Sequence, residues 1–406
     1  MTSATEEVLK EGWLFKQAGK MFKTWNRRYF KLTSQELQYD KAPKTPMKNS
    51  IKLTKISYVA LAPDCKRQPA FKFEIPDVKT YYFVTEAPSE ATAWVNAIEC
   101  YRTSDVDMKD IQISDFEVDT HLHQSQNCSI QRVKNKLNQQ FYVIKRYGRF
   151  AFAGRVDEIV NKEKEFLSIG NPFVTSLRQI LCNDMEVCMI YDYVPNGCLF
   201  TRLLEEGKFD EKSTAFYSAE ILLALSYLHQ HGALAGKLTP NSILICPDGH
   251  IKVTEPGPQT INPMESNEYT APELLDPQSS DPTVLGGPQQ VTAKTDIYNF
   301  GLLVYYMLCG MPPFYDDDKE IQKKLIRECR IFYPHHVSDN ARSFISELMN
   351  VDPEKRPDLE KIKTLKFFSG ISWEMASAKQ LAPPFIPSKQ YLTLNEYERN
   401  NSEHFC

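Results

Sequence analysis

The sequence has little of what would direct a protein out of the cytoplasm. Its 406 residues include ten cysteines but no Cys-x-x-Cys pair. No N-terminal apolar segment resembles a signal peptide, and the longest apolar run, Phe300 to Met307, is too short to span a bilayer. Internal repeats and low-complexity tracts are absent as well. These absences predict a cytoplasmic protein with reduced cysteines, and they leave no motif for a metal site.

The amino-acid composition is that of an ordinary globular protein. Hydrophobic residues make up 42% of the chain and charged residues 25%, and 406 residues are too many for one core, so two or three domains are expected. The net charge of −4 hides an asymmetry. Residues 1–103 carry 17 Lys and Arg against 11 Asp and Glu, whereas the remainder carries 31 against 41. This predicts an anionic partner for the first domain alone, and nothing indicates nucleic acid.

The first hundred residues have the alternation of short β-strands and then change period. The expected strands lie within 8–62, at 71–75 and at 80–84, and they are rich in aromatic and β-branched residues. From Glu90 to Tyr101 the period becomes helical and places one apolar face together, formed by Ala91, Trp94, Val95 and Ile98. The pattern predicts a small β-barrel capped by a C-terminal helix.

The motifs EGWLFK and WNRRYFKL, followed by the helix with Trp94, resemble a pleckstrin-homology (PH) domain. The opening is similar to the PH domain of the protein kinase B family. The resemblance implies a PH domain over residues 7–103 and a linker over residues 104–114.

Basic residues of this module gather in two stretches without an acid, 16–31 and 41–55. The resemblance implies that a phosphoinositide headgroup contacts four of them, which are Lys16, Lys20, Lys23 and Arg28. Multiple cations on one hairpin suit a headgroup that carries several phosphates, and the planar fork of arginine can bind one of them with two hydrogen bonds.

Two neighbouring residues leave the lipid specificity open. Asn26 stands where PH domains that bind 3-phosphoinositides have a second basic residue, and Arg27 is expected on the opposite face of its strand from Arg28. The alternatives to specific phosphoinositide binding are a non-specific attraction to anionic membranes and no lipid role at all.

A second, longer series of motifs begins at Asp115. Its members include DFE (115–117), FYVIK (141–145), FYSAEILLALSYLH (216–229), DGHIKV (248–253), EYTAPELL (268–275), KTDIYNFG (294–301) and DPEKRP (352–357). Together they resemble an AGC-type protein kinase, again one similar to protein kinase B. The resemblance implies an α+β, two-lobed protein-kinase fold over residues 115–368 and an AGC-type C-terminal tail over residues 369–406.

The groups that transfer phosphate in such a kinase are replaced in this sequence. His123, Ser125 and Cys128 occupy the three glycine positions of the phosphate loop. In the catalytic loop, Lys237 replaces the aspartate base, Gly236 replaces the arginine before it, and Ser242 replaces the metal-binding asparagine. Glu255 and Pro256 replace the first two residues of the D-F-G motif. A lysine cannot accept the substrate hydroxyl proton near neutral pH. Because these groups act as a unit, losing several of them leaves little catalysis.

Other kinase positions are retained. Lys145 matches the phosphate-binding lysine, with Glu163 as its expected partner. Structural roles are implied for Glu273, Asp296 and Arg356, and Ser266 matches the activation-loop phosphorylation site.

These observations predict a catalytically inactive kinase homologue, recruited to a phosphoinositide membrane, that acts as a scaffold or regulator by binding a kinase or other protein partner. No cofactor is required. One alternative is a weakly active serine/threonine kinase or ATP-gated switch in which Lys145, Glu163 and Glu255 bind ATP and Mg²⁺ weakly. Another is a structural adaptor whose PH domain binds protein.

Overall fold

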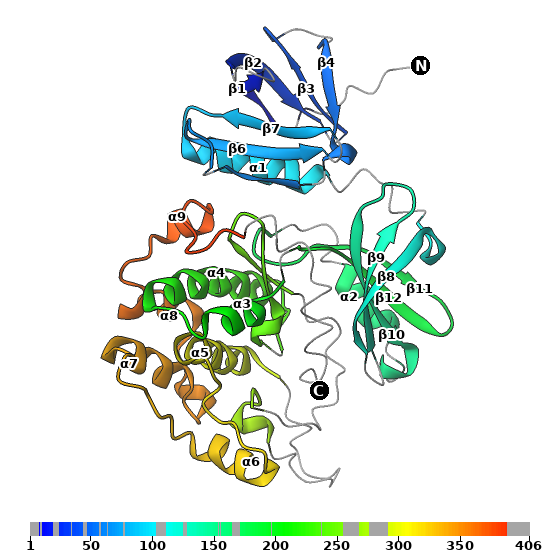
Figure 1. The fold of residues 1–406 in the computed structure, drawn as a ribbon. Helices are drawn as coiled ribbons and strands as arrows, with labels where there is room; N and C mark the ends of the chain where they lie inside the picture. The colour runs from blue at the N-terminus through cyan, green and yellow to red at the C-terminus, as the bar shows by residue number, and fades with distance from the viewer. Residues whose placement is uncertain are drawn as a thin grey trace.

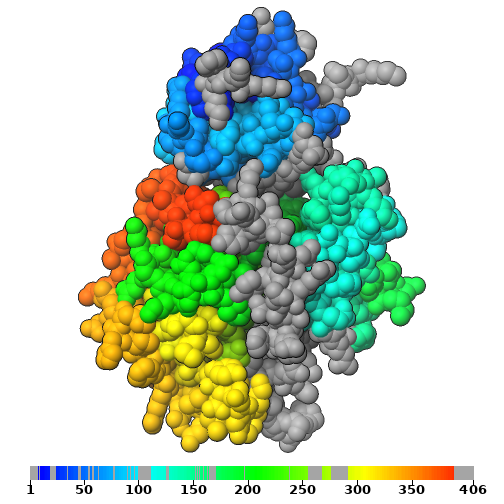
Figure 2. All heavy atoms as spheres, in the orientation of Figure 1, coloured from blue at the N-terminus to red at the C-terminus, as the bar shows by residue number. Residues whose placement is uncertain are grey.

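The computed structural model describes most of the chain (Figure 1). The described residues are 8, 10–18, 24–33, 35–43, 47–56, 58–62, 64–75, 78–102, 111–124, 128–152, 154, 156–164, 171–195, 197–236, 238–254, 268–275 and 291–387. A β-rich barrel, a β-rich small lobe and a helical large lobe follow one another along the chain, and Figure 2 shows them in blue, cyan to green, and green to red.

Seven antiparallel strands and one helix form the N-terminal barrel. The strands are β1 (Lys10–Ala18), β2 (Thr24–Leu32), β3 (Glu36–Asp40), β4 (Asn49–Lys52), β5 (Tyr58–Leu61), β6 (Ala70–Ile75) and β7 (Lys79–Val84). Their order in the sheet is β4-β3-β2-β1-β7-β6-β5. The helix α1 (Pro88–Arg102) follows, and its predicted apolar face is buried, with Trp94 only 1% exposed and its ring 6.5 Å from that of Phe30.

The small lobe is a five-stranded antiparallel sheet with one helix. Its elements are β8 (Phe116–Gln124), β9 (Cys128–Asn135), β10 (Phe141–Gly148), α2 (Val156–Lys164), β11 (Leu177–Cys182) and β12 (Glu186–Asp192). The strand order is β11-β12-β10-β9-β8. Val156 and Val160 of α2 pack on one face of this sheet, and Ile111 and Phe116 pack on the other. Both faces are therefore covered by apolar contacts.

The large lobe is mainly helical. It contains α3 (Leu199–Glu206), α4 (Glu211–Gln230), β13 (Ile243–Ile245), β14 (Ile251–Val253), α5 (Ala293–Cys309), α6 (Lys319–Glu328), α7 (Asp339–Leu348), α8 (Leu359–Lys363) and α9 (Trp373–Ser377). The 3₁₀ turns among the described residues are η1 (Leu53–Lys55), η2 (Ile113–Asp115), η3 (Arg149–Phe152), η5 (Pro240–Ser242), η6 (Pro272–Leu274), η7 (Pro353–Lys355) and η8 (Lys366–Phe368). Among the helices that the structure describes, none is long and apolar enough to cross a membrane.

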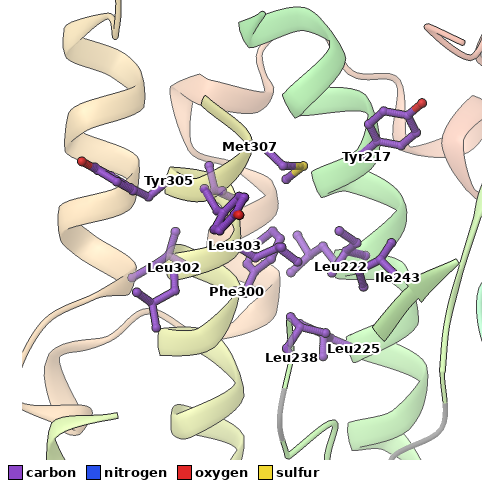
Figure 3. Close-up of a cluster of buried hydrophobic side chains, with 14 of the residues drawn as sticks. Tyr217, Leu222, Leu225, Leu238, Ile243, Phe300, Leu302, Leu303, Tyr305 and Met307 are labelled. Atoms are coloured by element: carbon purple, nitrogen blue, oxygen red, sulfur yellow. The ribbon is translucent and has the colours of Figure 1, made fainter. Parts of the chain in front are cut away.

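The core of the large lobe lies between α4 and α5. Every residue of α5 from Thr295 to Leu308 is buried, as expected for a helix that is apolar on all sides. Figure 3 shows Phe300 of α5 and Leu222 of α4 in this core. The long helix α4 begins at Glu211, because Asp210 caps it by accepting a hydrogen bond from the Ser213 N–H at 2.7 Å.

Arg356 is the largest buried cation of the described large lobe, and it is 1% exposed. Two of its nitrogens donate to the two carboxylate oxygens of Glu273, each at 2.7 Å. It also donates to the carbonyl oxygens of Lys294 and Asn350, each at 2.8 Å, and its guanidinium lies 4.9 Å from the centre of the Tyr298 ring. The pair joins η6, which contains Glu273, to the residue that directly follows η7, so it connects parts of the lobe that are far apart in sequence.

We expect Arg356→Ala to destabilise the large lobe by about 3–5 kcal/mol, because it leaves the Glu273 carboxylate without its partner. Chemical denaturation of the full chain measures the change. The matched control is Lys355→Ala, since Lys355 is the exposed neighbour and its loss should cost no more than about 0.5 kcal/mol. Equal stability of the two variants would contradict a structural role for the Arg356–Glu273 pair.

Candidate functional site

The open end of the barrel holds a cavity of about 410 Å³. It is lined by Lys16, Ala18, Asn26, Arg28, Tyr39, Asp40, Lys41, Lys48 and Asn49. Lys16 and Asn26 are cross-strand partners on β1 and β2, so they and Arg28 share the inner face of this hairpin. The cavity therefore brings together two of the four residues predicted to contact a headgroup.

Lys16 lies among aromatic rings and other cations. Its Nζ is 3.8 Å from the centre of the Tyr39 ring and 5.1 Å from that of Tyr81. Burial, together with the nearby charges of Lys79 and Arg28, lowers the pKa of Lys16 to about 8. An anion bound beside Lys16 would raise this pKa again and so favour the protonated, charged amine.

The other two predicted lipid contacts, Lys20 and Lys23, lie outside the described residues. Arg27 points away from the cavity, where its guanidinium lies 4.7 Å from the Trp13 ring and 3.5 Å from a carboxylate oxygen of Glu86. The predicted side for Arg27 is therefore correct.

Two cavity residues, Lys41 and Lys48, were not among the predicted contacts. Their signal in the sequence is the acid-free stretch 41–55, which contains five lysines, but the sequence alone does not show which of them line a cavity.

In the small lobe, Lys145 lies on the sheet face that α2 covers. It is opposite Ile130 of β9 and Met189 of β12, and cross-strand partners share a face. Its Nζ is 4.8 Å from the centre of the Tyr191 ring, which is buried. Glu163 is half-buried near the end of α2, and its pairing with Lys145 stays a prediction.

Two of the three residues that replace the glycines of the predicted phosphate loop lie on the strands that flank it. His123 is exposed on β8, and Cys128 is half-buried at the start of β9, where burial raises the pKa of its thiol. Ser125 lies outside the described residues. Both described side chains project where a glycine would leave the backbone accessible.

Arg132 connects three parts of the same sheet face. It lies opposite Val143, the neighbour of Lys145 on that face. Its Nε donates to an Asp119 oxygen at 2.6 Å, and one of its terminal nitrogens donates to the Thr120 hydroxyl at 3.2 Å; both acceptors are on β8. The other terminal nitrogen donates to the Tyr193 hydroxyl at 3.1 Å, just after β12.

Aromatic stacking and charge reinforce this network. The Arg132 guanidinium lies 5.5 Å from the centre of the Phe141 ring and 5.4 Å from that of Tyr193. Burial by itself would lower the pKa of Arg132 and raise that of Asp119. The hydrogen bonds and charges that the two residues share outweigh burial, so the pKa of Arg132 is raised and that of Asp119 stays below its ordinary value. We call these residues, Arg132, Asp119, Thr120, Tyr193 and Phe141, the Arg132 latch.

In the large lobe, Asp296 holds the segment that corresponds to the catalytic loop. Its side chain is fully buried and accepts hydrogen bonds from the backbone N–H groups of Ala235 and Gly236, each at 2.8 Å. His229 lies 2.8 Å from the same carboxylate, and the Asn299 amide donates to the Gly236 carbonyl at 3.1 Å. Gly236 has a φ of 70°, which favours glycine over a side-chain-bearing residue.

Ser242 uses its hydroxyl within its own turn. The Thr239 N–H donates to it at 3.0 Å, and the hydroxyl donates to the Thr239 carbonyl at 2.8 Å, which closes η5. Within the described residues no group of three or more His, Cys, Asp or Glu side chains could hold a metal. Lys237, Glu255, Pro256 and Ser266 lie outside the described residues, so their predicted roles stay predictions.

Comparison with known families matches both halves of the chain. The model "Protein kinase domain" matches residues 111–368, and the model "PH domain" matches residues 8–100. These matches confirm the predicted fold, an N-terminal PH domain followed by a two-lobed kinase domain.

Curated relatives match across both domains. A "RAC family serine/threonine-protein kinase homolog" of Dictyostelium discoideum is 29% identical over 95% of this chain and 88% of its own length. The "RAC-beta serine/threonine-protein kinase" of Homo sapiens is 26% identical over 94% and 88%. The "RAC serine/threonine-protein kinase" of Drosophila melanogaster is 28% identical over 94% and 72%. The chain therefore belongs to the protein kinase domain family, carries an N-terminal PH domain, and is homologous to the RAC, or protein kinase B, family of serine/threonine kinases.

Proposed function

We propose that this chain is a catalytically inactive homologue of the RAC-type kinases that acts at membranes as a scaffold or regulator. The observation that carries the proposal is the segment held by Asp296. Two backbone N–H groups of this segment donate to the buried Asp296 carboxylate, while its sequence has Lys237 in place of the aspartate base. The support for the loop is retained and the group that would perform the chemistry is not.

The chemistry of the replaced residues also indicates a loss of catalysis. A lysine cannot take the proton of a substrate hydroxyl near neutral pH. Ser242 commits its hydroxyl proton to Thr239, which leaves a weaker metal ligand than asparagine at that position. Phosphoryl transfer depends on positioning and charge supplied by several groups at once, so the combined loss leaves little catalysis.

The Arg132 latch supports weak nucleotide binding at most. In a protein kinase the face of the small-lobe sheet that carries Lys145 is the roof of the nucleotide cleft. Arg132 fills part of that face and connects β8 to the residues after β12. Tyr191, a bulky buried ring, lies against Lys145 on the same face. A nucleotide would have to displace these contacts before it could bind.

The PH domain supplies the membrane part of the proposal. A cavity that gathers Lys16, Arg28, Lys41 and Lys48 at one end of the barrel suits the phosphates of an inositol headgroup. No acid pairs with these four cations among the described residues. Recruitment to phosphoinositides would then bring the kinase-like domain to a membrane, where it would bind a kinase or another regulator.

We expect the purified full-length chain to show no thermal shift with millimolar ATP and Mg²⁺ and no phosphate transfer to itself or to a basic peptide. The reason is the missing base and metal ligands. The alternative, a slow kinase or ATP-gated switch, requires a shift or a turnover that Lys145→Ala removes. Such turnover, absent from the variant and present in the parent, would overturn the proposal of inactivity.

Removing the latch should open the cleft. We expect Arg132→Ala to bind a fluorescent ATP analogue roughly tenfold more tightly than the parent chain, because the nucleotide no longer competes with the latch. Amide hydrogen exchange in β8 should also accelerate.

The control for the latch is Arg146→Ala. Arg146 pairs with Glu186 at 3.1 Å on the same strand as Lys145 but on the opposite face of the sheet. Faster exchange in β8 without any gain in nucleotide affinity would show that Arg132 does not guard the cleft.

Binding of a soluble 3-phosphoinositide headgroup should depend on pH through Lys16. An anion binds the protonated amine, so affinity is greatest below pH 7 to 8 and falls as pH rises through the Lys16 pKa of about 8, by at most about tenfold per pH unit. Calorimetry between pH 7 and pH 9 measures this fall. Lys16→Arg keeps its charge and should give a nearly flat profile; an equal fall in this variant would show that another group titrates.

A further inference from the structure

The helix α6 has opposite charges at its two ends. Residues 315–320, at its start, include four acids and one lysine, whereas residues 321–330 include four cations and one acid. Gln322 and Ile326 face the lobe and are buried, while most of the charged side chains are exposed. Figure 1 shows α6 at the edge of the large lobe. The charges therefore lie on a surface that is open to solvent.

Part of this charge pattern serves the helix itself. Asp318 caps α6 by accepting hydrogen bonds from the N–H groups of Glu320 and Ile321, at 2.8 and 3.3 Å. Acids at the N-terminus and cations at the C-terminus also stabilise a helix through its dipole. Neither effect explains why large apolar side chains are exposed on the same surface.

The exposed apolar side chains lie on α6 and on both sides of it. Ile321, on the helix, is 47% exposed. Tyr315 lies four residues before α6 and is 61% exposed, and Phe332 lies four residues after it and is 79% exposed. An aromatic ring therefore follows each end of the helix at the same distance in sequence. Exposed apolar side chains with charged neighbours are typical of an interaction surface.

The two segments that flank α6 are anchored to the core. Before the helix, Phe314 is buried, and its carbonyl accepts a hydrogen bond from the Gln322 amide at 3.3 Å. After the helix, the Phe332 carbonyl accepts a hydrogen bond from the Tyr305 hydroxyl of α5 at 2.7 Å. Because the backbone on both sides is held in this way, a partner would have little of it to order on binding.

We propose that residues 315–332, which we call the α6 surface, bind the α6 surface of a second copy of this chain, with the two helices antiparallel. A two-fold interface must be complementary to itself. The antiparallel arrangement places the acidic end of each helix against the cationic end of the other. It also brings Tyr315 of each copy toward Phe332 of the second copy, with Ile321 between them. A parallel arrangement would bring like charges together.

The charges favour a second copy over the other possible occupants. An anionic membrane or a nucleic acid would attract the cationic end of α6 and repel the acidic end. A second copy satisfies both ends and covers the apolar side chains. One short helix with its flanking segments offers a small area, so we expect a weak, reversible dimer with a Kd of about 10 μM. This inference is independent of the proposed inactivity and of membrane recruitment.

Sedimentation velocity of the full-length chain between about 1 and 100 μM measures this association. We expect dimerisation to weaken at least about tenfold when salt is raised from about 50 to 500 mM, because salt screens the charges between the two helices. A parent chain that stays monomeric throughout this concentration range overturns the proposal.

Two charge-reversal variants test the antiparallel arrangement. Lys324→Glu with Arg330→Glu reverses the cationic end, and Asp317→Lys with Glu320→Lys reverses the acidic end. We expect each variant alone to dimerise at least about a hundredfold more weakly than the parent, because like charges would then face each other. An equimolar mixture of the two should dimerise again, since acids would once more face cations. This recovery would also show that both variants are folded.

The matched control is Lys361→Glu with Lys366→Glu. It makes the same change in net charge at two exposed lysines of α8 and η8, outside the α6 surface, and should dimerise as the parent does. The α6 surface is rejected if this control loses as much affinity as the reversal variants, or if those variants dimerise as the parent does. A mixture that remains monomeric rejects the antiparallel pairing. None of these measurements uses ATP or lipid, so each outcome leaves the proposed function untouched.

Discussion

A single buried carboxylate organises the functional part of this protein. Asp296 lies inside the large lobe without solvent exposure, and a charge in that position is tolerated only when hydrogen bonds surround it. The N–H groups of Ala235 and Gly236 and the ring of His229 supply those bonds. Because α5 cannot be moved without exposing this charge, the loop segment, α4 and α5 form one unit. The position of the segment is therefore maintained by folding energy and does not depend on the chemistry of residue 237.

This arrangement is consistent with the proposal that the kinase fold persists after substitution of its catalytic positions. The core of the lobe consists of apolar side chains from α4 and α5, and the Arg356–Glu273 pair closes it from one side. Of the replaced positions that the structure describes, none contributes a side chain to that core. Ser242 even adds local stability, since its hydroxyl completes the turn of η5. Substitution at such positions changes what the surface can bind or transfer while the fold keeps most of its free energy.

The elements of the fold could be predicted because local patterns determine them. The helical period around Trp94 and the buried run of α5 are visible in the sequence alone. The role of Arg132 could not be predicted from the sequence. Its partners are 12, 13 and 61 residues away and meet only when β8, β9 and the segment after β12 are assembled. Lys41 and Lys48 could not be singled out either, since they belong to one acid-free stretch with five lysines and meet at the cavity only in the folded barrel.

The Arg132 latch has a further consequence for a partner that recognises the small lobe. In an active kinase the angle between the roof strands and the hinge changes as nucleotide enters and leaves, so the surface that other proteins meet follows the supply of ATP. If nucleotide binding is as weak as we propose, the bonds of Arg132 to Asp119 on β8 and to Tyr193 would take the place of that ligand. The lobe would present one shape in energy-rich and energy-poor cells alike. Its output would then follow its abundance and its location at membranes, and would be independent of metabolic state.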